Sequence, residues 1–305
     1  MSETQTTADV DSEPAETSDQ QSFLSVFART VRNDRLALVG TIGLGITIFV
    51  AVFGPFVLPH DPTATNLDQM NQAPSFVHPF GTDRYGRDIL ARVALGARTS
   101  LIVAFVGVAV AAGVGVTLGA IAGYYEGLLG EGIMRFADTI FSFPALLLAL
   151  AMVAIMGQNW YNVIIAVGVV YWPIFARITR GSVLSVKDEE FVQAARSIGE
   201  SDFRIIGSEI LPNITAPIIV QGTISMAVAI LLESALSFLG LGVPPPDPSW
   251  GRMLADSRQF MTHAPWWTIA PGLAIMFTVL NLNFVGDALR DALDPHQGDE
   301  MEATR

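Results

Sequence analysis

The sequence contains several long apolar runs without charge, and the first of them decides the class of fold. Leu36 to Leu58 is a run of 23 residues without Asp, Glu, Lys or Arg. At ~1.5 Å per residue a helix of this length spans ~34 Å, enough to cross the hydrocarbon core of a bilayer. The whole chain is 51% hydrophobic and only 15% charged. The sequence therefore predicts an all-α membrane protein.

Six spans are predicted, with both chain ends in the cytoplasm. Their expected ranges, in order, are 36–58, 99–122, 136–157, 160–176, 214–241 and 266–287. Pro144 is expected to break the third span. Arg29, Arg32 and Arg35 precede the first span, and the positive-inside rule places them in the cytoplasm. Eleven of the 17 Lys and Arg residues then fall on cytoplasmic segments, although the first external loop carries four arginines.

The spans divide the chain into four expected parts. The first 28 residues contain six acids and no Lys or Arg, so they lack the basic start of a signal peptide and are typical of a disordered tail. The expected parts are an acidic cytoplasmic tail (1–28), the first transmembrane helix with a long external loop (29–98), the transmembrane core (99–290) and a second cytoplasmic tail (291–305).

Small residues recur at four-residue spacing in the second span. They are Ala111, Gly115, Gly119 and Gly123. A stripe of this kind lets two helix backbones approach closely. It predicts packing within the bundle rather than a role in conduction.

The stretch from Ser185 to Pro212 is the longest polar interruption in the second half of the chain, and it predicts two short helices. Ser185 is expected to N-cap the first helix, with Asp188 completing a capping box. Gly199 stands where a helix favours a left-handed residue at its C-terminal end. Ser201 is expected to cap the second helix, which Pro212 ends.

One face of the first short helix is expected to be apolar. Phe191, Ala195 and Ile198 follow helical spacing, and Ala194 lies beside them. A hairpin this short cannot bury such a face by itself. It is therefore predicted to dock against another protein.

This hairpin resembles the EAA loop of importer-type ABC transporter permeases. The residues that carry the resemblance are Gln193-Ala194-Ala195, then Gly199, then Leu211-Pro212. In that family the loop is a coupling helix that seats in a cleft of the ATPase subunit. The sequence departs from the family pattern at Gln193, which replaces a Glu, and at Glu209, which replaces an aliphatic residue. The resemblance implies ATPase coupling by Glu190, Gln193, Ala194, Ala195, Gly199, Leu211 and Pro212.

Further stretches resemble one permease subfamily, which serves dipeptides, oligopeptides and nickel. They are His78 to Asp83, Gly86 to Asp88, Arg92, Gly96, Arg98 to Leu101, Leu232 to Gly242, Pro248 to Gly251, and Gly286 to Pro295. The resemblance covers roughly residues 25–295 and points to the second, C-type permease subunit. It implies a type I ABC importer fold of six transmembrane helices. It also implies three kinds of partner: a similar permease subunit, two ATPase subunits and an external substrate-binding protein that delivers short peptides. Nickel or an oligosaccharide stays open as alternative cargo.

The chain itself is not expected to be an enzyme. A P-loop needs Gly-Lys-Ser/Thr, and the single lysine, Lys187, follows Val186. Any ATP and Mg²⁺ are therefore expected on the partner ATPase subunits, and no cofactor is expected in this chain.

Three polar residues of the predicted spans are possible members of a translocation path. A charge at Glu233 costs at least ~2.5–3.5 kcal/mol inside a span, so this side chain is expected to face a cavity or a partner. A structural hydrogen bond is the favoured role, and a contact with a peptide amine is the alternative. Asn281 and Asn283 lie about 160° apart on a helix, so at most one faces a central path.

Other polar residues are given structural roles. Asp138 is expected to cap a helix or to pair with Arg135. No two of the four histidines have metal-ligand spacing, so no metal site is predicted. His78 and His263 are both expected to be external; two solvated histidines are the favoured interpretation, and a meeting of the two in space is the alternative. Two roles stay open for the charged residues of the first external loop, which are ion pairs within the loop and a docking surface for a binding protein. These residues are Asp83, Arg84, Arg87 and Asp88.

Rival functions find less support in the sequence. An ion-driven transporter needs a carboxylate relay, and Glu233 and Asp138 lie toward opposite ends of the bilayer. An intramembrane hydrolase needs a motif such as GxSxG or HExxH, and neither occurs. The net charge of −12 argues against nucleic-acid binding. It also suits a high-salt cytoplasm. We keep a halophilic source as a hypothesis that full stability in dilute buffer would contradict.

Overall fold

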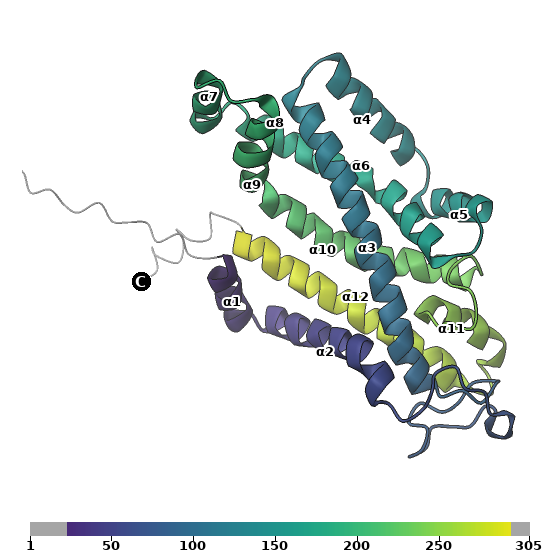
Figure 1. The fold of residues 1–305 in the computed structure, drawn as a ribbon. Coiled ribbons are helices and arrows are strands. Elements are labelled where there is room, and N and C mark those ends of the chain that lie inside the picture. The colour runs from purple at the N-terminus through teal and green to yellow at the C-terminus, as the bar shows by residue number, and fades with distance from the viewer. Residues whose placement is uncertain (1–22, 294–305) are drawn as a thin grey trace, which may run out of the picture.

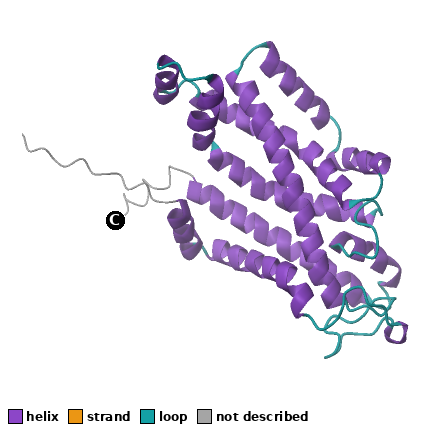
Figure 2. Ribbon diagram, in the orientation of Figure 1, coloured by secondary structure: helices purple, strands orange, loops and turns teal. Residues whose placement is uncertain are grey.

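A computed structural model describes residues 23–293 of the chain, and these form a helical bundle (Figures 1 and 2). No strand occurs within this part of the chain. The elements, in order, are α1 (Phe23–Asn33), α2 (Arg35–Val57), η1 (Leu67–Gln69), α3 (Ile89–Tyr124), α4 (Leu128–Phe141), α5 (Ala145–Met156), α6 (Trp160–Val186), α7 (Glu190–Ser197), α8 (Asp202–Arg204), the π-helical turn η2 (Ile205–Ile210), α9 (Leu211–Asn213), α10 (Thr215–Phe238), α11 (Trp250–Ser257), η3 (Arg258–Phe260) and α12 (Pro265–Leu293).

Five of the described helices are long and apolar enough to cross a membrane: α2, α3, α6, α10 and α12. Helices α4 and α5 make a sixth span if they are counted together, although the pair is bent by 87° at its break. Pro144 lies at this break as the residue before α5, where its ring prevents α4 from continuing. The expected all-α membrane fold and the broken third span are therefore confirmed.

Several predicted boundaries are wrong because helices run past the apolar stretches. Helix α3 begins at Ile89 rather than 99, since Asp88 caps it by accepting a 2.8 Å hydrogen bond from Ala91 N. Helix α4 begins at Leu128 rather than at 136, the predicted start of the third span. A helix continues through its backbone hydrogen bonds until a cap or a turn ends it, and this point need not coincide with the end of the apolar stretch.

The same effect lengthens the helices at the opposite ends of two spans. Helix α6 continues ten residues beyond the predicted 176, and α12 continues past 287 to Leu293. At the N-terminus, α1 occupies residues that were assigned to the acidic tail, and Asp34 separates it from α2 by capping Leu36 N at 2.8 Å. The predicted tails at 1–22 and 294–305 lie outside the described residues.

The small-residue stripe of α3 packs directly against α6. A Cβ added at Gly115 would lie 2.5 Å from Phe175 Cβ, and one at Gly119 would lie 2.9 Å from Ala176 Cα. A Cβ at Gly123 would lie 2.7 Å from Val183 Cβ. The two backbones are therefore too close for any side chain between them, and the predicted packing role of the stripe is confirmed.

We predict that Gly119→Ala destabilises the bundle and that Gly113→Ala does not. Both glycines lie on α3, but no atom lies within 4 Å of a Cβ built at Gly113. Overpacking at Gly119 should lower the free energy of unfolding by ~1–3 kcal/mol. Alanine at Gly113 should be neutral or stabilising by up to ~1 kcal/mol, since glycine is a poor helix former. Thermal unfolding of the purified subunit in detergent micelles measures both, and equal midpoints would contradict the close-packing explanation.

Candidate coupling site

The hairpin between α6 and α10 lies beyond the end of the bundle (Figure 1). It consists of α7, α8, η2 and α9 in succession. Gly199 ends α7 with φ of +81°, and Gly199 N donates to Arg196 O while Glu200 N donates to Ala195 O at 3.1 Å. This pair of bonds is a Schellman motif. The predicted left-handed glycine turn is therefore confirmed.

The predicted caps of the hairpin are wrong. Ser185 lies inside α6, and its Oγ donates to Ser182 O at 2.8 Å, so it forms no capping box with Asp188. Ser201 precedes α8 but its side chain makes no capping hydrogen bond. The expected end of the second helix near Pro212 is confirmed, since the helical run from Asp202 ends one residue later at Asn213, before Ile214 turns the chain into α10.

The inner face of the hairpin is buried against the chain's own helices. Val192 and Ala195 of α7 point inward, and Ala195 is only 7% exposed. Leu211 packs partly buried at the edge of the same cluster. The buried members of this cluster are Ala120, Val183, Val192, Ala195, Ile205, Ile210 and Ile214. The hairpin is therefore a packed unit that rests on α3, α6 and α10.

The outer face of α7 is apolar and exposed. Phe191, Ala194 and Ile198 follow i, i+3 and i+7 spacing, and Ile198 is 78% exposed. Phe203 of α8 adds a ring that is 89% exposed. The prediction that Ala195 shares this face is wrong, since Ala195 packs inward with Val192. Exposed apolar side chains at helical spacing are the pattern of a helix that docks in a groove.

Two tyrosines at the end of α3 fasten the hairpin to the bundle. Tyr124 Oη donates to one carboxylate oxygen of Asp202 at 2.8 Å, and Tyr125 Oη donates to the other at 2.9 Å. These bonds hold the pKa of Asp202 below its ordinary value. The guanidinium of Arg196 lies 5.1 Å over the Tyr124 ring. Lys187 forms an ion pair with Glu126 in the same α3–α4 turn.

The remaining predicted coupling residues lie around the hairpin surface. Glu190 and Pro212 are exposed. Gln193 is also exposed, and its amide Nε2 donates to Asp188 O at 2.9 Å. Gln193 therefore ties α7 back to the turn that follows α6.

Glu233 is completely buried near the C-terminal end of α10. Its two carboxylate oxygens accept hydrogen bonds from Ser100 Oγ at 3.0 Å and from Ser237 Oγ at 2.6 Å. Ser249 Oγ donates to Ser237 Oγ at 3.1 Å and caps α11 by accepting from Arg252 N. The network joins α3, α10 and α11, and it leaves Glu233 no exposed surface within this chain. This placement favours the structural role.

The two asparagines of α12 have opposite environments. Asn281 is buried against α2, where it leaves no room for a side chain at Gly43, and its Nδ2 donates to Phe277 O at 2.6 Å. Asn283 is exposed. Of the two, only Asn283 has a side chain that the described bundle leaves uncovered, and its place on a translocation path stays a prediction.

Asp138 does not have the predicted partner. It lies in the last turns of α4, so it caps no helix start, and its Oδ1 accepts a 2.8 Å hydrogen bond from Arg177 Nη2 of α6. The pair is exposed and joins α4 to α6. The predicted pairing with Arg135 is therefore wrong.

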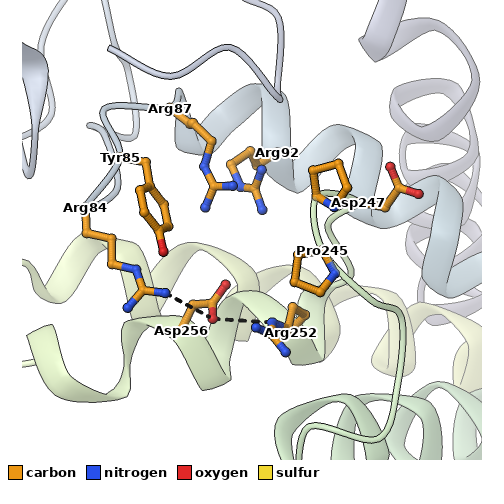
Figure 3. A pocket seen from close by; sticks show the side chains of 9 residues that line it. Arg84, Tyr85, Arg87, Arg92, Pro245, Asp247, Arg252 and Asp256 are labelled. Carbon is orange, nitrogen blue, oxygen red and sulfur yellow. Dashed lines mark ion pairs between the residues drawn. The ribbon is translucent and has the colours of Figure 1, made fainter. Parts of the chain in front are cut away.

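Arginines gather in a small pocket of ~60 Å³ between the loop before α3 and α11 (Figure 3). Arg252 Nε lies 3.3 Å from Asp256 Oδ1, and Arg84 Nη2 lies 4.0 Å from the same oxygen. Arg87 forms the expected ion pair within the loop, at 2.6 Å from Asp83. The lining residues are Arg84, Tyr85, Arg87, Arg92, Pro245, Pro246, Asp247, Arg252 and Asp256. A docking role for this surface stays a prediction.

The architecture is that of an inner-membrane permease subunit of an ABC importer. Its fold is similar to that of the MetNI methionine ABC transporter in an inward-facing conformation, with a TM-score of 0.55 over 68% of this chain and 96% of that chain, at 17% identity. A likeness at this identity shows the type I importer fold alone.

The chain belongs to the family of binding-protein-dependent transport system inner membrane components, whose model matches residues 115–298. The N-terminal TM domain of oligopeptide transport permease C matches residues 22–74. The chain is 47% identical to the dipeptide transport permease DppC of Alkalihalophilus pseudofirmus, over 88% of each protein. It is 44% identical to the glutathione transport permease GsiD of Escherichia coli, over 88% of this chain and 89% of the relative.

We predict that Glu233→Ala impairs folding and that Glu233→Gln largely preserves both folding and uptake. The alanine leaves the Ser100 and Ser237 hydroxyls without their acceptor, which should cost about 2–4 kcal/mol of unfolding free energy. The glutamine keeps the shape and one carbonyl acceptor. Thermal unfolding and substrate uptake in proteoliposomes measure the two effects. A Glu233→Gln variant that assembles normally but loses uptake would instead place Glu233 on the translocation path.

Proposed function

We propose that this chain imports short peptides as the C-type permease subunit of an ABC importer. The ATP is hydrolysed by partner subunits, since this chain has no P-loop in its sequence. The observation that carries the proposal is the two-sided hairpin, which is packed inward on three spans and exposes an apolar helix face outward. The names of the relatives, dipeptide and glutathione permeases, support a peptide cargo.

The hairpin has the contacts of a mechanical coupling element. Its inner cluster includes Ala120 of α3 and Val183 of α6, and Ile214 leads directly into α10. Force applied to α7 is therefore transmitted to three spans at once. The hydrogen bonds from Tyr124 and Tyr125 to Asp202 hold the hairpin in one orientation relative to α3. When the ATPase subunits close, we expect the hairpin to move as a rigid body and to tilt these spans, which switches access between the two sides.

The proposed assembly contains a second, similar permease, two ATPase subunits and an external binding protein, with ATP and Mg²⁺ on the ATPases. We place the hairpin and both termini in the cytoplasm. Helix α1 packs against α12 and, with the end of α12, lies at the same side of the bundle as the hairpin, opposite the loop that precedes α3 (Figure 1). A cysteine-labelling map that found the hairpin outside would overturn this orientation.

Uptake by the reconstituted complex tests the cargo. Proteoliposomes that contain both permeases, the ATPases and the cognate binding protein should accumulate a labelled dipeptide or glutathione. They should do so only when ATP is present on the side of the membrane that carries the ATPase subunits. Nickel and an oligosaccharide serve as the alternative cargoes. Accumulation of either one without peptide uptake would keep the importer architecture but contradict the peptide assignment. Uptake that persists without ATP would favour an ion-driven transporter.

We predict that Ile198→Glu releases the ATPase without unfolding the permease. Ile198 is largely exposed, so the change leaves the core intact, but it places a charge where an apolar anchor should enter the ATPase cleft. Binding should weaken at least ~10-fold, as for removal of an interface hot spot. Leu128→Glu is the matched control, since Leu128 is 92% exposed at the start of α4, outside the hairpin.

Pull-down of the ATPase subunits and thermal unfolding of the permease provide the two measurements. Retained ATPase binding by the Ile198→Glu variant would contradict the docking face. The change Ala195→Trp is a poorer test, because Ala195 is buried in the hairpin's own core and the large ring would disturb folding and docking together.

A further inference from the structure

Two histidines and an aspartate, far apart in the sequence, meet at the outer end of α3. His78 Nδ1 lies 2.8 Å from Asp88 Oδ2, and His60 Nδ1 lies 3.7 Å from the same oxygen. The centroids of the two imidazole rings are 4.6 Å apart. His78 and Asp88 are each only 4% exposed, whereas the His60 side chain is 34% exposed. The favoured interpretation of His78 as a solvated histidine is wrong, because its side chain is buried. Of the alternatives left open, His78 meets His60 rather than His263, whose Nδ1 bonds Thr262.

Hydrogen bonding alone does not account for this arrangement. His78 Nδ1 faces the Asp88 carboxylate, and His78 Nε2 lies 3.2 Å from the carbonyl oxygen of the Gln69 side chain. A neutral imidazole has one ring proton and donates to only one of these acceptors. A second ring proton, a reversed Gln69 amide or a cation beside Nδ1 would each resolve the conflict. A cation would in addition draw His60, whose Nδ1 lies 3.7 Å from the same carboxylate oxygen, into one shared site.

The distances suit a tetrahedral metal ion. An ion with bonds of ~2.0–2.1 Å holds its ligand atoms ~3.3 Å apart. The two measured nitrogen–oxygen distances, 2.8 Å and 3.7 Å, lie on either side of that value. One ligand atom from each of the three residues lies within 4.8 Å of the others. Two imidazoles and a carboxylate are the donor set of zinc and similar divalent ions.

Neighbouring groups already hold the three side chains in place. Asp88 Oδ1 accepts the Ala91 amide at 2.8 Å, which leaves Oδ2 for the two histidines. With a metal on His78 Nδ1, the proton on Nε2 is free to donate to Gln69, which is the usual outer partner of a ligating histidine. The exposed side of His60 gives an ion a route in and leaves room for a water as fourth ligand.

We propose that His60, His78 and Asp88 form an external binding site for a divalent transition-metal ion, with zinc as the expected occupant. The site joins the segment just after α2, the middle of the external loop and the first turn of α3. An ion bound here would fasten the loop over the outer end of the bundle. It would be a resident structural ion, independent of the transported cargo.

Zinc titration of the full-length chain in detergent micelles tests the proposal. The protein carries a histidine-free affinity tag and is first treated with a chelator. Wild type should bind one Zn²⁺ and unfold at a higher temperature with zinc than without it. His60→Gln should weaken zinc binding at least ~10-fold and lose the thermal shift. Asp88 variants are avoided because Asp88 also caps α3.

His263→Gln is the matched control, because it removes another external histidine that lies outside the cluster. It should bind zinc as wild type does. Equal zinc affinity of wild type and His60→Gln would overturn the proposal, as would a wild type that binds no zinc. A thermal midpoint that responds to pH but not to zinc would also overturn it and would assign the cluster to protonation.

Discussion

The close contact between α3 and α6 is the constraint on which the rest of the structure depends. Glycines spaced along α3 remove the side chains that would separate the two backbones, from Gly107 against Val167 to Gly123 against Val183. The pair is thereby held together along most of its length. Since α6 then continues past the apolar stretch, it carries the following hairpin over the end of α3, where Tyr124 meets Asp202.

This geometry gives the hairpin two faces with different roles. The inner face closes a core of its own on α3, α6 and α10, while the outer face leaves Phe191 and Ile198 uncovered. A loosely attached loop would absorb a push by bending. A hairpin that is packed, and fastened through a carboxylate to two tyrosines, passes the push to the spans. That is the property which the coupling function proposed above requires.

The outer end of the bundle is held by buried polar groups rather than by apolar packing alone. Glu233 joins three helices through serine hydroxyls, and Asp88 combines the cap of α3 with the histidine cluster. Buried polar groups are stable only when their partners are in place. They therefore fix the loop before α3 and α11 in one arrangement.

The sequence alone determined the class of protein and much of its local structure. Apolar run lengths predicted the spans, the glycine stripe predicted a close helix contact, and Gly199 predicted the left-handed turn, because each signal is local or periodic along the chain. Only the tertiary structure decided that Ala195 faces inward, that Asp202 bonds tyrosines 77 and 78 positions away, and that His60 joins His78. These contacts depend on how distant helices and loops pack, and no spacing along the chain encodes the side of a short helix that its neighbours cover.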